Sequence, residues 1–287
     1  MSLHGPNLTG QVTISPSPGG NYRLKIGAGA STDVFQGEWI PQEALVAVKI
    51  FRSTSTDDAT RVQDINRRVI RESHVWLGLS RPHILSYLGY CTNLSLSVAL
   101  ISPFCSHGTI KQYLRQHVTA NRQNFVNQVV SGLWYLHANN IIHGDLQGKN
   151  VLVDNSHNAR LCDFGRAKVI GDAEYSTALV AGCAPYMAPE LFPEDESIVD
   201  ELFSPSSDIY AFGMLAFEIF TDEVPFNSLG ALSQFRIMAS VIRGDRPSRS
   251  SDTQRHISDD MWEIMQRCWV ANPMARPTAF AIVQRIL

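Results

Sequence analysis

The sequence predicts an α+β protein made of a small strand-rich part followed by a larger helical part. Three observations predict it. Short apolar segments rich in β-branched and aromatic residues, separated by turn residues, occur between residues 22 and 104. After residue 105 apolar residues recur at helical spacing. With 287 residues, 44% of them hydrophobic, the chain can build a full core.

The elements of the first part follow in order. Residues 1–21 are rich in glycine, proline and serine and predict a flexible tail. A helix is expected over residues 58–79. Four segments have the composition of strands: VFQGEWI (34–40), ALVAVKIF (44–51), ILSYLGYC (84–91) and LSVALISPF (96–104).

The second part shows helical periodicity to its end. The segment NFVNQVVSGLWYLHANN (124–140) places Phe125, Val129, Leu133 and Leu136 on one face. DIYAFGMLAFEIF is apolar nearly all round and predicts a buried helix. Helical patterns continue in DDMWEIMQRCWV and FAIVQRIL. A ligand is expected in a cleft between two such parts.

Composition excludes several classes of function. The 24 basic and 27 acidic side chains give no electrostatic reason to expect nucleic acid or an anionic membrane as a partner. No apolar run has membrane-spanning length, and the start does not resemble a signal peptide. Five cysteines without a CxxC pair argue against a zinc site and for a reducing, cytoplasmic environment. Oligomeric state is not legible.

The segment IGAGASTDV (26–34) has two glycines, Gly27 and Gly29, between predicted strands. Glycines there let backbone amides approach phosphates closely. The segment also fits an ordinary hairpin, and Thr32 stands where a third glycine would strengthen phosphate binding. No helical pattern follows, which excludes a dinucleotide fingerprint.

Two charged residues could complete a phosphate site. Lys49 ends the apolar strand segment VAVK, and Glu72 lies in the helical segment RRVIRESHVW. Lys49 could reach phosphates, with Glu72 as its ion-pair partner. The alternative is an exposed lysine and an ordinary solvated helix glutamate.

The segment HGDLQGKN (143–150) is followed by LCDFG (161–165). Asp145, Asn150 and Asp163 are therefore two carboxylates and one amide that could share a magnesium ion and a hydroxyl substrate, since hard cations prefer oxygen ligands. Phosphoryl transfer needs held phosphates, bound metal and a group that accepts the hydroxyl proton.

The order of these motifs closely resembles the eukaryotic protein kinase family over about residues 22–287. RPHILSYLGYC and YMAPE are most similar to its tyrosine-kinase-like serine/threonine branch. Three further segments resemble family elements in the family's order: GCAPYMAPE (182–190), SDIYAFG (207–213) and NPMARPT (272–278).

The resemblance implies a bilobal fold that binds ATP in its cleft. A small antiparallel β-sheet lobe with one long helix is expected over about residues 22–102, a hinge over 103–106, and a larger helical lobe over 107–287. Asp208 should anchor the catalytic loop, and Arg276 should pair with Glu190.

The resemblance also implies roles for the site residues. Asp145 would accept or orient the hydroxyl proton, while Asn150 and Asp163 would hold Mg²⁺. Lys49, fixed by Glu72, would hold the α- and β-phosphates. Further nucleotide contacts are expected from Ile26, Gly27, Ala28, Gly29, Ala30, Val34, Ala47, Pro103 and Cys105.

Three positions depart from the family. Gly144 replaces an arginine that usually pairs with an activation-loop phosphate. Phosphorylation of the loop residues Tyr175, Ser176 or Thr177 is therefore not expected to act through that contact, unless Arg166 or Lys168 takes over.

Gln147 replaces a lysine that meets the γ-phosphate, and we expect Lys149 to supply the missing charge as an additional catalytic residue. The alternative is that Lys149 is a solvated loop lysine. Cys183 replaces a threonine whose hydroxyl ties the catalytic loop to the activation segment. Because a thiol is a weaker donor, we expect a looser tie and a plain buried thiol rather than a redox switch.

Lys49, Glu72, Asp145, Asn150 and Asp163 are all present, which favours an active enzyme. The sequence therefore predicts an ATP-dependent kinase of protein serine or threonine hydroxyls, with tyrosine as the alternative acceptor. The competing hypothesis is a pseudokinase scaffold that binds nucleotide and signals through protein contacts. The acidic segment FPEDESIVDE (192–201) could favour basic peptides or be a solvated loop.

Overall fold

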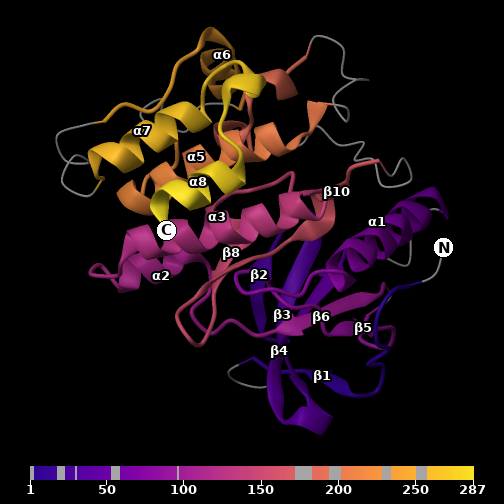
Figure 1. Ribbon diagram of the computed structural model, residues 1–287. Coiled ribbons are helices and arrows are strands. Elements are labelled where there is room, and N and C mark those ends of the chain that lie inside the picture. The colour runs from indigo at the N-terminus through magenta and orange to yellow at the C-terminus, as the bar shows by residue number, and fades with distance from the viewer. Residues whose placement is uncertain are drawn as a thin grey trace. The chain divides into compact units, whose positions relative to one another are not determined.

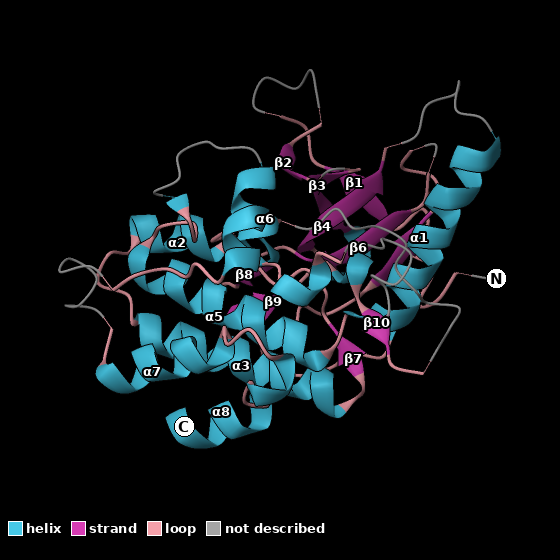
Figure 2. Ribbon diagram, turned by 90° about the horizontal axis from the view of Figure 1, so that it is seen from above, coloured by secondary structure: helices cyan, strands magenta, loops and turns pink. Residues whose placement is uncertain are grey.

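The computed structural model describes residues 3–17, 23–29, 31–52, 59–95, 97–171, 183–193, 202–227, 234–249 and 257–287. The chain divides into two compact units, Met1–Ser106 and His107–Leu287. An antiparallel sheet and one long helix form the first unit, and helices dominate the second (Figures 1 and 2). The predicted α+β organisation is confirmed.

The sheet of the first unit has the strand order β1-β3-β4-β6-β5, and β2 also pairs with β3. The predicted strands 34–40 and 44–51 are close to those observed, whereas ILSYLGYC forms a strand only at its last three residues. The strands are β1 (Val12–Ile14), β2 (Lys25–Ala28), β3 (Thr32–Trp39), β4 (Ala44–Phe51), β5 (Gly89–Cys91) and β6 (Ala99–Pro103).

Alternation along β4 separates the core from the candidate site. Val46, Val48 and Ile50 point to one face, where they pack in a buried cluster, and Ala47 and Lys49 point to the other. Leu8, Val12, Cys91, Ala99 and Ile101 complete this cluster.

The N-terminal segment differs from the expected flexible tail over 1–21. Among its described residues, 3–17, β1 pairs antiparallel with β3, and Leu8 and Val12 are 4% and 2% exposed in the core. The glycine and proline content concealed a few apolar side chains, and these are enough to fix the segment on the sheet.

The helix α1 (Ala59–Leu77) closely follows the predicted range 58–79. Val69, Val75 and Trp76 are buried, and the Trp76 indole N–H donates to the Leu85 carbonyl at 2.6 Å. This bond fixes the C-terminal end of α1 to the segment that leads into β5.

Helices make up most of the second unit. The predicted face of α3 is confirmed, because Phe125, Val129, Leu133 and Leu136 are all buried, and α5 is buried nearly all round. No helix among the described residues has the length and apolarity to cross a bilayer. The helices are α2 (Ile110–Gln116), α3 (Arg122–Ala138), α5 (Pro205–Thr221), α6 (Gln234–Arg243), α7 (Asp259–Cys268) and α8 (Ala279–Ile286).

Two short strand pairs, too small for the sequence pattern to predict, shape the loops of the second unit. β7 (Ile141–Ile142) pairs with β10 (Lys168–Val169), and β8 (Val151–Val153) pairs with β9 (Ala159–Leu161). The candidate loop 143–150 joins β7 to β8, so both of its ends are held by strand pairing.

Leu8→Ala should lower the free energy of unfolding by about 2–4 kcal/mol, because it removes buried apolar volume from the core. Urea unfolding measures the change. Leu45→Ala is the matched control, since Leu45 is 52% exposed in the same unit. Equal effects of the two substitutions would contradict the packing of the N-terminal segment.

Candidate active site

The glycine-containing turn of the first unit joins β2 to β3. Gly27 lies opposite Val34, and the Gly29 N–H donates to the Thr32 carbonyl at 2.8 Å. A Cβ on Gly29 would lie 2.7 Å from the Thr32 hydroxyl oxygen, so the buried Thr32 packs directly beneath this glycine. Ile26 and Ala28 are exposed on β2, and Ala30 lies outside the described residues.

A cluster of charges braces this turn, and sequence reasoning missed it. Asp33 pairs with Lys25 at 2.7 Å and with Arg52 at 2.9 Å, and Arg52 also donates to the Gly29 carbonyl at 3.0 Å. The hydrogen bonds from Arg52 and Lys25 lower the pKa of Asp33 to about 2. These contacts stabilise the turn between β2 and β3 through side chains that belong to no recognisable sequence motif.

The strand register places part of the predicted nucleotide site on one face of the sheet. Val34 lies opposite Lys49, and Ala47 lies two residues before Lys49 on the same strand. Pro103 pairs with Val46 and therefore lies on the opposite face from Ala47 and Lys49. Cys105 is buried beyond the end of β6. The sheet thus brings Val34, Ala47 and Lys49 together but not Pro103.

The predicted pair of Lys49 and Glu72 is present. The Lys49 ammonium lies 2.6 Å from Glu72 Oε1, and the Glu72 side chain is 1% exposed. A carboxylate this deeply buried needs a partner. The pair therefore joins β4 to α1 and fixes the Lys49 ammonium on the face that also carries Val34 and Ala47.

The candidate loop of the second unit is anchored by a buried carboxylate. Asp208, 2% exposed at the start of α5, accepts hydrogen bonds from the backbone N–H groups of His143 at 2.7 Å and Gly144 at 3.0 Å. His137 Nε2 lies 3.0 Å from the same carboxylate. The anchoring contact expected from the family resemblance is therefore present.

Both carboxylate oxygens of Asp145 are held by amide donors. Gln147 Nε2 donates to Oδ1 at 2.5 Å, and Asn150 Nδ2 donates to Oδ2 at 3.0 Å and to the Asp145 carbonyl at 2.7 Å. Burial raises the pKa of Asp145, and the charges of Arg166 and Lys149 act in the opposite direction. Sequence reasoning had treated Gln147 only as a missing lysine.

The hairpin of β8 and β9 brings Asn150 and Asp163 to the same end. Asn150 precedes β8, Asp163 follows β9, and the Cys162 N–H donates to the Asn150 carbonyl at 3.0 Å. Asp163 has a left-handed backbone, with φ 65°. The negative charge of Asp163 acts to raise the pKa of Asp145. The hairpin explains why the motifs at 143–150 and 161–165, which are separate in the sequence, place their polar side chains at the same end of the β8–β9 pair.

The chemistry of these side chains fits a magnesium ion bound together with phosphates. Asn150 uses its NH₂ group on Asp145, and no residue that the structure describes donates a hydrogen bond to its amide oxygen. Magnesium takes one or two protein oxygens and completes its shell with phosphate and water.

Gly144 occupies a position that favours glycine. Its φ is +74°, and a Cβ would lie 2.6 Å from the Arg166 carbonyl oxygen. The local backbone therefore favours glycine at position 144 over any residue with a side chain. Arg166 itself has a buried Nη1 atom that finds no hydrogen-bond partner among the residues that the structure describes.

Lys149 and Cys183 lie near Asp145. Lys149 is exposed, and its charge acts on both the Asp145 carboxyl and the Cys183 thiol. Burial raises the pKa of Cys183, which keeps the thiol protonated and agrees with an unreactive side chain. The loop residues Tyr175, Ser176 and Thr177, and residues 194–201 of the acidic segment, lie outside the described residues.

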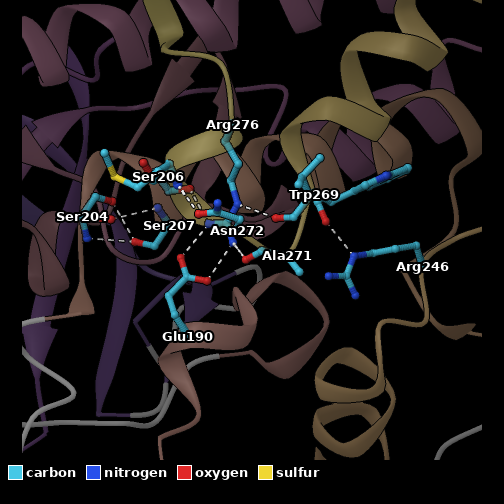
Figure 3. Close-up of polar contacts among 11 residues, drawn as sticks. Glu190, Ser204, Ser206, Ser207, Arg246, Trp269, Ala271, Asn272 and Arg276 are labelled. Atoms are coloured by element: carbon cyan, nitrogen blue, oxygen red, sulfur yellow. Dashed lines mark hydrogen bonds and ion pairs between the residues drawn. The ribbon is translucent and has the colours of Figure 1, made fainter.

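The expected pair of Arg276 and Glu190 is also present (Figure 3). Arg276 Nη1 and Nη2 donate to the two Glu190 oxygens at 2.6 and 2.7 Å. The same guanidinium donates to the carbonyls of Ser206, Ala271 and Val270. The Arg276 side chain, with no exposed surface, thus joins the segment after the activation loop to α5 and to the turn before α8.

Comparisons with known proteins agree with this geometry. Residues 21–286 match the sequence model of the family described as protein tyrosine and serine/threonine kinase. The chain is 27% identical to mitogen-activated protein kinase kinase kinase 3 of Arabidopsis thaliana over 99% of its own length and 45% of that protein. It is 29% identical to serine/threonine-protein kinase CTR1 of Arabidopsis thaliana, over 93% of this chain and 31% of that protein. The chain therefore spans less than half the length of these relatives.

Glu190→Gln should lower the free energy of unfolding by about 2–3 kcal/mol, because it leaves the buried Arg276 guanidinium without its counter-charge. Glu263→Gln is the matched control, since it breaks an Arg–Glu pair at the surface, with Arg285, and should produce no measurable change. Chemical denaturation compares the two. A Glu190→Gln protein as stable as the control would rule out the structural role of this pair.

Proposed function

We propose that this chain, which belongs to the protein tyrosine and serine/threonine kinase family, transfers the γ-phosphate of ATP to serine or threonine hydroxyls of proteins. The observation that carries the proposal is the intact carboxylate Asp145, held at both oxygens by Gln147 and Asn150. Serine and threonine are favoured over tyrosine because relatives such as CTR1 are named serine/threonine-protein kinases.

The residues of the second unit perform the chemistry. Asp145 orients the acceptor hydroxyl and takes its proton as the oxygen attacks the γ-phosphorus. The bond from that phosphorus to the β–γ bridging oxygen breaks, and ADP leaves. Asn150 and Asp163 supply oxygen ligands for Mg²⁺, which when bound neutralises charge on the phosphates. Because the amides of Gln147 and Asn150 hold the carboxylate, Asp145 loses little freedom in the reaction.

The residues of the first unit bind the nucleotide. Lys49, fixed by Glu72 at 2.6 Å, contacts the α- and β-phosphates. The turn that follows β2 has no side chain at Gly27 or Gly29, so phosphates can approach its backbone, and Val34 and Ala47 present apolar surface to the base. Cys105, in the segment that follows β6, would add a further contact, whereas the register of β6 leaves Pro103 on the opposite face of the sheet.

The scaffold alternative depended on residues that depart from the family, and the structure gives three of them a local function. Gly144 fits a left-handed backbone, Gln147 holds Asp145, and Thr32 packs beneath Gly29. No observation among the described residues favours loss of the phosphate or metal ligands.

The proposal is tested by incubating the full chain with MgATP and a protein acceptor rich in serine and threonine. Radiolabelled phosphate should be transferred, and phosphoamino-acid analysis should find phosphoserine or phosphothreonine. Asp145→Asn should lower kcat by about 10³-fold or more, because the hydroxyl loses its proton acceptor. Asp260→Asn is the matched control, since the Asp260 side chain is 88% exposed on α7 of the same unit. Nucleotide binding without any transfer would contradict the proposal.

Lys149→Met should lower kcat by about 10–100-fold if Lys149 supplies the cation that Gln147 does not. The reason is that its charge already acts on Asp145 across the same loop. Steady-state kinetics with saturating ATP measure the change. Arg115→Met, which changes an exposed basic residue of α2 in the same unit, is the control and should retain activity. Unchanged turnover in Lys149→Met would make it an ordinary solvated lysine.

A further inference from the structure

We propose that residues 4–14, here called the N-terminal strap, position helix α1 so that Glu72 meets Lys49. The strap precedes residue 21, where the match to the kinase family begins. The residues matched by the family model therefore do not include it, and the proposed function gives it no role. The contacts described below lie within the first unit.

One part of the strap lies along β5, the last strand of the sheet. The Leu8 N–H donates to the Tyr90 carbonyl at 2.8 Å, and the Tyr90 N–H donates to the Pro6 carbonyl at 3.0 Å. Gly89 makes this approach possible. Its φ is +147°, and a Cβ there would overlap the Pro6 carbonyl oxygen.

The start of the strap contacts the C-terminal end of α1. The His4 ring packs edge-on against the His74 ring, with centroids 4.6 Å apart. His74 lies two residues after Glu72 on the same helix. The Tyr87 hydroxyl donates to the His4 carbonyl at 3.0 Å, and the Tyr87 ring stacks on Trp76 of α1 at 5.2 Å. The strap thus reaches α1 both directly and through Tyr87.

The other end of the strap is fixed behind the strand that carries Lys49. Leu8 and Val12 belong to the same buried cluster as Val48 and Ile50, the two neighbours of Lys49 in β4. β1 then pairs with β3 at the opposite edge of the sheet. One segment therefore packs behind one partner of the ion pair and against the helix that carries the other.

This arrangement has an energetic consequence for the ion pair. Movement of α1 away from the sheet must break the contacts of His4 and Tyr87 as well as the bond between Lys49 and Glu72. The strap consequently increases the population in which the pair is formed. His4 and Tyr87 are positioning residues, because they act on the nucleotide site only through α1.

Hydrogen exchange of the full chain, followed by mass spectrometry, tests this without requiring catalysis. Tyr87→Phe removes the hydrogen bond to His4 and keeps the ring stack, so amides in residues 66–77 should exchange about fivefold faster. His4→Ala should act in the same direction. Thr9→Ala is the matched control, since Thr9 contacts Thr92 at the sheet edge and does not touch α1.

Catalysis supplies the second readout, which rests on the proposed function. A chain lacking residues 2–10 should show about tenfold lower kcat, and a peptide of residues 1–10 added in trans should restore it. The single substitutions decide the matter if the shortened chain does not fold. The proposal would be overturned if α1 amides of both Tyr87→Phe and His4→Ala exchanged at the wild-type rate. It would also be overturned if Thr9→Ala accelerated their exchange as much as these two substitutions do. If the wild-type chain shows no kinase activity, the proposed function is refuted. The hydrogen-exchange result then still decides whether the strap positions α1.

Discussion

The candidate loop 143–150 depends on one buried carboxylate, that of Asp208. A carboxylate with almost no exposed surface is costly unless donors surround it, and the N–H groups of His143 and Gly144 together with His137 provide them. These bonds set the course of the backbone immediately before Asp145. Because Asp208 binds this backbone to α5, the hydrogen bonds from Gln147 and Asn150 can hold the Asp145 carboxylate in one place.

The positive charge around Asp145 comes from different sequence positions than the family resemblance leads one to expect. The family's arginine and lysine within the loop are replaced by Gly144 and Gln147. Arg166 and Lys149 nevertheless place positive charge near the carboxylate, and both favour its ionised form. Gln147 adds a neutral donor at 2.5 Å. The loop therefore has an orienting hydrogen bond from position 147, and the positive charge comes from Lys149 of the same loop and from Arg166.

The sequence predicted the long elements and the charged pairs because each leaves a strong local signal. The helical period exposed α3 and α5, and the kinase resemblance anticipated the contacts of Glu72 with Lys49 and of Glu190 with Arg276. It could not predict β1, because three residues among glycines and prolines have no periodicity. The bonds of Gln147 and of Arg52 were equally hidden, since each depends on backbone directions that only the folded chain defines.

The pairing of β1 with β3 has a consequence for solubility. β1 covers the backbone edge of β3 from Gly37 to Trp39, and β2 covers the part further toward Thr32. A protein that begins at residue 21, the first residue matched by the family model, would lack β1. The N–H and C=O groups of β3 from Gly37 to Trp39 would then be open to other molecules. Unprotected edges of this kind recruit strands from neighbouring chains, so such a fragment would aggregate through intermolecular β-pairing.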